Sequence, residues 1–177
     1  MKKTIINLAL ILIGFIIYFL QANFFSWFTI NGIKPNLFVI YILFIGLFGN
    51  RSMGIIYGAV AGIFLDLLYK TNVGINLAGL VIVGLLAILF NKNFSKDSRF
   101  IVTLMVIITT ANYEIVLYIF TMLRTEGTIE ILAFSKILLV ELVFNTLITI
   151  IIYPLIKKAG YYVENLFDDK FILTRYF

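Results

Sequence analysis

Six stretches of the chain are apolar over enough residues to cross a membrane, and this feature constrains the fold more than any other. They cover residues 4–20, 36–49, 53–68, 75–90, 101–123 and 137–156. A helix needs about 20 mostly apolar residues to cross a hydrocarbon core about 30 Å thick. Of the 177 residues, 62% are apolar or aromatic and 13% are charged, against about 45–50% and about 25% in soluble domains. We therefore predict an all-α integral membrane protein with six transmembrane helices.

The sequence contains no histidine and no cysteine. Their absence removes serine–histidine and cysteine–histidine nucleophiles, thiolate chemistry, imidazole metal ligands and disulfides. We therefore predict a protein that is not an enzyme and that uses no cofactor or metal ion. The net charge of +5 is explained by basic loops that meet anionic lipid headgroups, and no nucleic-acid site is indicated.

Basic residues fall unevenly on the two sides of the predicted bundle. Ten lie on one side, namely Lys2, Lys3, Arg51, Lys92, Lys96, Arg99, Lys157, Lys158, Lys170 and Arg175, and four lie on the other, namely Lys34, Lys70, Arg124 and Lys136. Because short cytoplasmic loops keep more Lys and Arg than external loops, the side with ten is predicted to be cytoplasmic. Both chain ends then lie in the cytoplasm, including a tail over residues 157–177 that suits an amphipathic helix on the inner membrane surface.

The third predicted span carries Gly54, Gly58 and Gly62 at intervals of four residues. Glycines at this spacing form a helical face without side chains, so another helix can approach closely, and in lipid such faces associate through backbone packing. Pro35 opens the second span and Gly74 leads into the fourth, and we group both with this stripe. The stripe predicts helix packing within the protein, with an interface to another protein as the alternative.

Several acidic and amide side chains lie inside the predicted spans, toward their external side, and one lysine lies at the membrane surface beside them. The former are Asp66, Asn112, Glu114, Glu141 and Asn145, and the lysine is Lys136. Ionisable groups at such a depth are costly and face protein or water, so we expect one intramembrane polar layer with Lys136 as the nearest counter-charge. Two interpretations stay open, namely an interhelical hydrogen-bond network that sets helix register, and a pocket for a ligand or ion.

Between the first two spans, four aromatic residues occupy five positions: Phe24, Phe25, Trp27 and Phe28. An aromatic belt at the level of the lipid headgroups explains this external segment. A docking surface for an extracytoplasmic partner is the alternative, because aromatic residues are enriched at interface hot spots.

The order of these features resembles the MreD family of bacterial rod shape-determining proteins. The resemblance rests on Pro35-Asn36-Leu37 opening the second span, on the glycine ladder that ends in Asp66-Leu67, and on Gly74 leading into the next helix. It implies a non-enzymatic scaffold of the cell-elongation machinery in the bacterial cytoplasmic membrane. Such proteins bind MreC, which has a single span and an extracytoplasmic domain, and act with MreB and the peptidoglycan synthases that build the lateral wall.

By the same resemblance, the helical arrangement is similar to the substrate-binding subunits of energy-coupling-factor vitamin transporters. A small-solute-binding subunit is therefore the alternative function. The first span contains Ala9 but lacks the Ala-xxx-Ala pair with which those subunits dock their energising module, and few polar side chains converge outside the polar layer. We favour the scaffold. An intramembrane protease fits less well, since the rhomboid type needs a histidine and the aspartyl type needs two aspartates, whereas the spans contain only Asp66.

Overall fold

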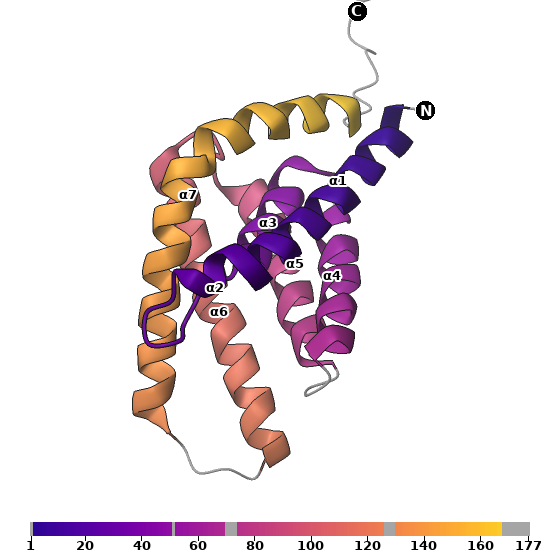
Figure 1. Ribbon diagram of the computed structural model, residues 1–177. Helices are drawn as coiled ribbons and strands as arrows, with labels where there is room; N and C mark the ends of the chain where they lie inside the picture. Colours follow the sequence, from indigo (N-terminus) through magenta and orange to yellow (C-terminus); the bar gives the residue numbers. More distant parts are fainter. Residues whose placement is uncertain (1, 51, 70–73, 126–129, 168–177) are drawn as a thin grey trace, which may run out of the picture.

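The computed structural model describes residues 2–50, 52–69, 74–125 and 130–167, which form a bundle of helices (Figure 1). The helices are α1 (Lys2–Phe19), α2 (Phe25–Trp27), α3 (Leu37–Phe48), α4 (Met53–Tyr69), α5 (Ile75–Asn93), α6 (Arg99–Thr125) and α7 (Ile131–Phe167). A π-helical turn, η1 (Leu20–Phe24), joins α1 to α2. Four helical stretches are long and apolar enough to cross a membrane: Lys2–Trp27, Ile75–Asn93, Arg99–Leu123 and Ile131–Phe167.

Each predicted span coincides largely with one helix, from α1 through α3 to α7. The main difference is at the end of the chain, where we predicted a crossing over residues 137–156 and α7 runs over Ile131–Phe167. Outside the described residues lie Arg51, residues 70–73 and 126–129 between the predicted spans, and residues 168–177 of the predicted tail.

The short helix α3 is the centre of the bundle. All of its 12 residues except Tyr41 are buried, because α1, α4, α5, α6 and α7 surround it. At 1.5 Å per residue the helix is only about 18 Å long, well short of a hydrocarbon core of about 30 Å. The N–H and C=O groups at its ends therefore need partners from the rest of the protein, since lipid tails supply none.

The last helix bends near Pro154 (Figure 1). Its first part stands along the bundle beside α6, and its last part, coloured yellow, lies across one end of the bundle. Proline has no N–H to donate to the carbonyl group of Ile150, and its ring clashes with that carbonyl, so a helix bends there. After the bend, Gly160 packs on the ring of Phe48, where an added Cβ would lie 2.4 Å from the ring.

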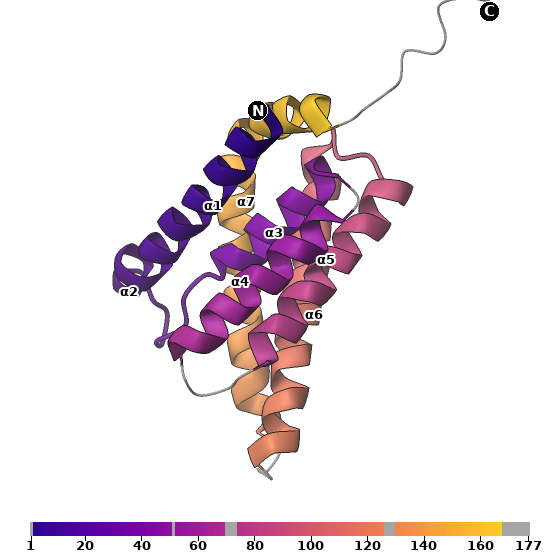
Figure 2. The same cartoon turned by 90° about the vertical axis from the view of Figure 1, so that its right-hand side faces the viewer.

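We call this end of the bundle the basic end, because it carries Lys92, Lys96, Arg99, Lys157 and Lys158. The beginning of α1 and the end of α7 both lie there (Figures 1 and 2). Residues 157–167 of the predicted tail are thus helical and pack on the bundle, where Lys96 pairs with Glu164 at 2.6 Å.

The helix α1 runs obliquely along the outside of the bundle (Figure 2). None of its 18 residues is buried. The Tyr41 hydroxyl donates a hydrogen bond of 2.5 Å to the carbonyl oxygen of Leu10. The rings of Phe15 and Tyr18 meet Phe64 of α4 edge-on, with centroids 5.5 and 5.3 Å away. The first helix is therefore held at a few points along its length.

Candidate functional site

The N-terminus of α3 is capped by polar side chains from three parts of the chain. Its own N-cap residue, Asn36, accepts a hydrogen bond of 3.4 Å from the N–H of Val39. The N–H of Asn36 donates to Asn145 Oδ1 of α7 at 2.9 Å. The N–H of Leu37 donates to Gln21 Oε1 of η1 at 3.0 Å. Three of the N–H groups at the start of this short helix thus find acceptors within the protein.

The N-terminus of α5 is capped by Asp66, which lies near the end of α4 and is 3% exposed. Its Oδ1 accepts from the backbone N–H and the side-chain amide of Asn76, at 3.0 and 2.9 Å. Its Oδ2 accepts from the N–H groups of Gly74 and Leu77, at 2.9 and 3.1 Å. A carboxylate is favourable at a helix N-terminus, where the backbone dipoles present positive charge. Four N–H donors therefore stabilise the buried Asp66 carboxylate.

Gly74, the N-cap residue of α5, has a φ of +97°. This left-handed conformation favours glycine, since a Cβ would strain it. The N–H of Gly74 donates to the Asp66 carboxylate, and α5 begins at the next residue.

Side chains of α6 link the two capped ends. The Tyr113 hydroxyl donates to Asn76 Oδ1 at 2.6 Å. The side-chain amide of Asn145 donates to Thr110 Oγ1 at 3.0 Å. We call the whole set the capping cluster; its members are Gln21, Asn36, Asp66, Asn76, Thr110, Tyr113, Glu114, Glu141 and Asn145.

Glu114 of α6 and Glu141 of α7 lie next to each other inside this cluster, 8% and 5% exposed. Glu141 also lies beside Asn36 and Asn145. Its Oε1 atom is buried and has no hydrogen-bond partner among the described atoms. Two adjacent carboxyl groups hydrogen-bond to each other only when they share a proton. Because Glu141 Oε1 has no partner among the described atoms, this pair keeps an acceptor that the neighbouring donors do not fill.

Of the predicted polar layer, the structure brings Asp66, Glu114, Glu141 and Asn145 together, and it leaves Lys136 and Asn112 out. Lys136 is exposed, and within the described ranges no ion pair joins it to the three acids. It precedes Glu141 by five residues, which is about 140° around a helix of 3.6 residues per turn. Our expectation that Lys136 supplies the counter-charge was therefore wrong.

Asn112 faces away for the same geometric reason. It lies two residues before Glu114, about 160° around α6. Its side-chain amide donates at 2.9 Å to the carbonyl oxygen of Ile108 in its own helix.

The glycine stripe of α4 faces α5 and α3 inside the protein. An added Cβ would come within 2.8 Å of Gly46 Cα at Gly54, within 2.5 Å of Leu80 O at Gly58, and within 2.4 Å of Leu77 Cα at Gly62. These atoms belong to the backbone and cannot move aside as a side chain can. Gly84 of α5 completes the contact from the other side, where a Cβ would lie 2.5 Å from Gly54 O. The glycine face is therefore covered by this chain's own helices.

The aromatic segment is helical up to Trp27, and its members differ in exposure. Phe25 packs against the core, whereas Phe24, Trp27 and Phe28 are exposed, Trp27 to 87%. Pro35 is buried and directly precedes Asn36, the N-cap residue of α3.

The C-terminus of α3 is capped by Lys96 at the basic end. Its ammonium donates to the carbonyl oxygen of Leu47 at 3.0 Å and to Glu164 at 2.6 Å, and it lies 5.0 Å from the centroid of the Phe48 ring. Both ends of the central helix are thus capped by side chains distant in sequence.

A second polar contact at the basic end holds α7 to the loop before α6. The Tyr161 hydroxyl and the Lys157 ammonium bind Asp97 Oδ1 at 2.6 and 3.0 Å. These two hydrogen bonds hold the pKa of the exposed Asp97 carboxyl below its usual range. The same contact raises the pKa of the Tyr161 hydroxyl to about 12, because the adjacent carboxylate favours the protonated phenol.

Most of the chain matches a known protein family. The family model for the rod shape-determining protein MreD matches residues 2–159, which include every residue of the capping cluster. The chain belongs to the MreD family. No curated protein and no solved structure matches it, so the expected similarity to energy-coupling-factor subunits is not supported. Family membership and the four long apolar helices make this a membrane protein with a rod-shape-determining role.

Sequence reasoning missed five residues of this MreD-family site: Gln21, Asn76, Thr110, Tyr113 and Lys96. Asn36 appeared only as part of the family motif, although an Asn directly before an apolar run is itself an N-cap signal. The others carry no local signal, because their partners lie in other helices. Among the residues described, no group of three Asp or Glu side chains is placed to hold a metal ion.

Proposed function

We propose that this protein is a non-enzymatic membrane scaffold of the bacterial cell-elongation machinery. It holds an MreC-type partner with a single span and, with MreB and the peptidoglycan synthases, helps to organise lateral wall synthesis. This extends the rod-shape-determining role of its family. The capping cluster supports a scaffold rather than an enzyme or a solute-binding subunit, because its polar groups satisfy helix ends and do not form an open site.

The observation that carries the proposal is the outward face of α1. Four large apolar residues follow one another at intervals of three, four and seven, and each is more than half exposed: Ile5, Leu8, Leu12 and Phe19. Side chains at this spacing form one ridge on a helix surface, which is the shape that packs into the groove of a second helix. We call this set the α1 ridge, and it is where the partner's single span packs.

The exposed aromatic residues continue this face beyond the end of α1. Trp27 and Phe28 follow η1, where the partner's chain leaves the membrane on the external side. The glycine face of α4 does not take part, since α5 covers it.

Recovery of an MreC-type partner from detergent with the purified protein tests this proposal. The double variant Leu8→Ala, Leu12→Ala should lower partner recovery at least tenfold, and Trp27→Ala with Phe28→Ala should lower it further. The matched control is Leu139→Ala with Val143→Ala, a pair with the same spacing on the exposed face of α7. Equal recovery with the α1 and α7 pairs would reject the α1 ridge as the contact.

The same proposal places the basic end, and with it both chain ends, in the cytoplasm. Because the chain has no native cysteine, single cysteines can be labelled cleanly in intact cells. A membrane-impermeant thiol reagent should label Leu132→Cys at the opposite end and should not label Ser95→Cys at the basic end. Labelling of Ser95→Cys from outside would invert the orientation.

A further inference from the structure

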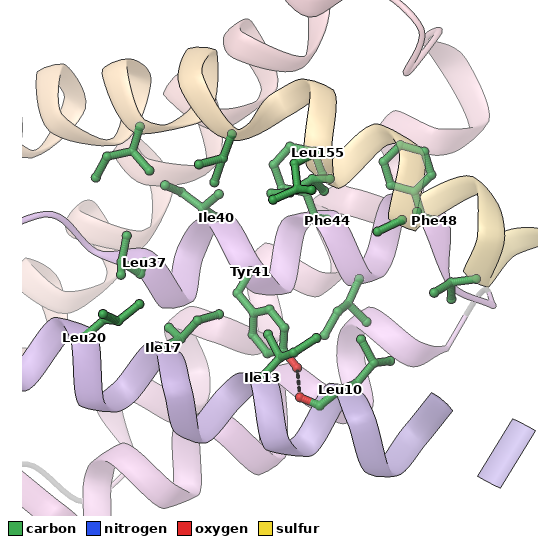
Figure 3. Close-up of a pocket in the computed structure, with 18 of the residues that line it drawn as sticks. Leu10, Ile13, Ile17, Leu20, Leu37, Ile40, Tyr41, Phe44, Phe48 and Leu155 are labelled. Carbon is green, nitrogen blue, oxygen red and sulfur yellow. Dashed lines mark hydrogen bonds between the residues drawn. The ribbon is translucent and has the colours of Figure 1, made fainter. Parts of the chain in front are cut away.

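An apolar groove of about 450 Å³ lies between α1 and the rest of the bundle (Figure 3). In Figure 3, Leu10, Ile13 and Ile17 of α1 and Leu20 of η1 face residues of α3, and α7 forms a third wall. Apart from the thioether of Met53, the lining side chains are aliphatic or aromatic, and the Tyr41 hydroxyl among them already donates to the carbonyl oxygen of Leu10. The groove therefore presents no polar group that calls for water.

The groove opens sideways onto the apolar surface of the protein. Two residues that line it, Ile13 and Leu155, are also exposed, Leu155 to 72%. A molecule dissolved in the lipid can therefore enter laterally between α1 and α7.

The length of the groove suits an acyl chain. It runs beside α3 from Leu37 to Phe48, a distance of about 16 Å along a helix. An acyl chain laid along this length meets an apolar lining throughout. The length also matches one leaflet, which is half of a core about 30 Å thick.

A second, polar pocket of about 430 Å³ continues the groove at the basic end. The two hollows share Gly49, and Val163 of the groove is followed in α7 by Glu164 of the pocket. Lys92 and Asn91 line the pocket. Glu164 is paired with Lys96, so its charge is compensated, whereas Lys92 forms no ion pair within the described part of the chain. The pocket therefore attracts an anion beside an apolar channel.

We propose that groove and pocket together bind one anionic phospholipid, with an acyl chain between α1, α3 and α7 and the phosphate beside Lys92. Lys158 adds a second exposed cation one residue before Ala159 of the groove wall. The bound lipid completes the packing of α1, none of whose residues is buried by the protein alone. It occupies the inner face of α1, opposite to the α1 ridge, and is independent of partner binding.

Native mass spectrometry of the full chain, purified in detergent and supplied with phosphatidylglycerol or phosphatidylcholine, tests the proposal. The unaltered chain should retain one phosphatidylglycerol and prefer it to phosphatidylcholine. Ile13→Trp and, separately, Leu155→Trp should fill the groove and abolish retention. Ile11→Trp, about 160° around α1 from Ile13, is the matched control and should retain lipid as the unaltered chain does. Leu155 is largely exposed, so its variant decides the outcome if Ile13→Trp does not fold.

The headgroup contact has its own control. Lys92→Gln should keep one bound lipid but lower the preference for phosphatidylglycerol about fivefold, whereas Lys136→Gln, an exposed lysine far from the pocket, should leave it unchanged. Retention in both tryptophan variants, equal retention of the two lipids by the unaltered chain, or equal behaviour of Lys92→Gln and Lys136→Gln would each overturn the proposal. If the unaltered chain is a dimer and Ile13→Trp is a monomer, the groove binds a second copy of the chain, and the proposal is overturned.

Discussion

The α4–α5 hairpin and α1 are both strongly apolar, yet they pack in opposite ways. In the hairpin, Gly54, Gly58 and Gly62 bring backbone against backbone, and Asp66 ties the end of one helix to the start of the next. The first helix has large aliphatic and aromatic residues around its whole circumference, none of them buried. In lipid, apolar side chains gain little by leaving the tails for another helix, so close packing depends on small residues and shared hydrogen bonds. Hydrophobicity alone therefore brings a helix into the membrane but does not position it.

The largest expected effect comes from filling the glycine face of the hairpin. Gly58→Leu should force α4 and α5 apart, because its Cβ alone would lie 2.5 Å from the carbonyl oxygen of Leu80. We expect a loss of more than about 3 kcal/mol in the free energy of unfolding, together with little folded protein and rounded cells. Val60→Leu is the matched control on the exposed face of the same helix. Rod-shaped cells with normal amounts of the Gly58→Leu protein would show that this close contact is not needed.

Asp66→Asn tests the hydrogen-bonded half of the same hairpin. An amide replaces one carboxylate oxygen with a donor, so two of the four N–H groups that Asp66 binds lose their acceptor. The free energy of unfolding should fall by about 2–4 kcal/mol, since each unsatisfied buried donor costs about 1–3 kcal/mol. Thermal unfolding in detergent measures this, with the exposed Asp97→Asn as control. If the two variants unfold alike, the capping contact contributes nothing specific.

Two substitutions of Glu114 distinguish a structural role of the capping cluster from an ion-binding role. If the cluster is a hydrogen-bond network, Glu114→Gln should retain stability and cell shape, whereas Glu114→Leu should lower the free energy of unfolding by about 1–3 kcal/mol. Thermal unfolding and rescue of cell shape measure both. Equal damage by the two variants would instead show that the pair with Glu141 needs a proton or a cation. No damage by either would mean that Glu114 contributes nothing to the cluster.

The smallest effect should come from α1. Tyr41→Phe removes the hydroxyl that donates to the carbonyl oxygen of Leu10 and should cost only about 0.5–1.5 kcal/mol. Hydrogen exchange should rise in α1 and stay unchanged in the α4–α5 hairpin. Tyr162→Phe, at an exposed position of α7, serves as the control. A faster exchange in the hairpin as well would show that α1 and the hairpin unfold together, and that α1 is not held separately from the hairpin.

The sequence alone was sufficient to predict the six main helices, although not the short η1 and α2 that follow the first of them. An apolar stretch of membrane-crossing length has no stable form in lipid other than a helix or a closed barrel, because lipid satisfies no backbone group. The glycine spacing likewise identified the face of α4 that permits close approach, and the order of motifs identified the family that the comparison shows. These features are local, so they can be read without knowledge of the neighbouring helices.

Only the tertiary structure decided which groups meet. Asn36 and Asn145 are 109 residues apart in the chain, and their hydrogen bond exists because α7 packs beside the start of the short α3. Asp66 is satisfied by N–H groups of α5 rather than by Lys136, which its position on the helix turns outward. Among apolar helices many pairings bury similar surfaces, and the choice depends on shape and on hydrogen bonds that close only when distant segments are already in place.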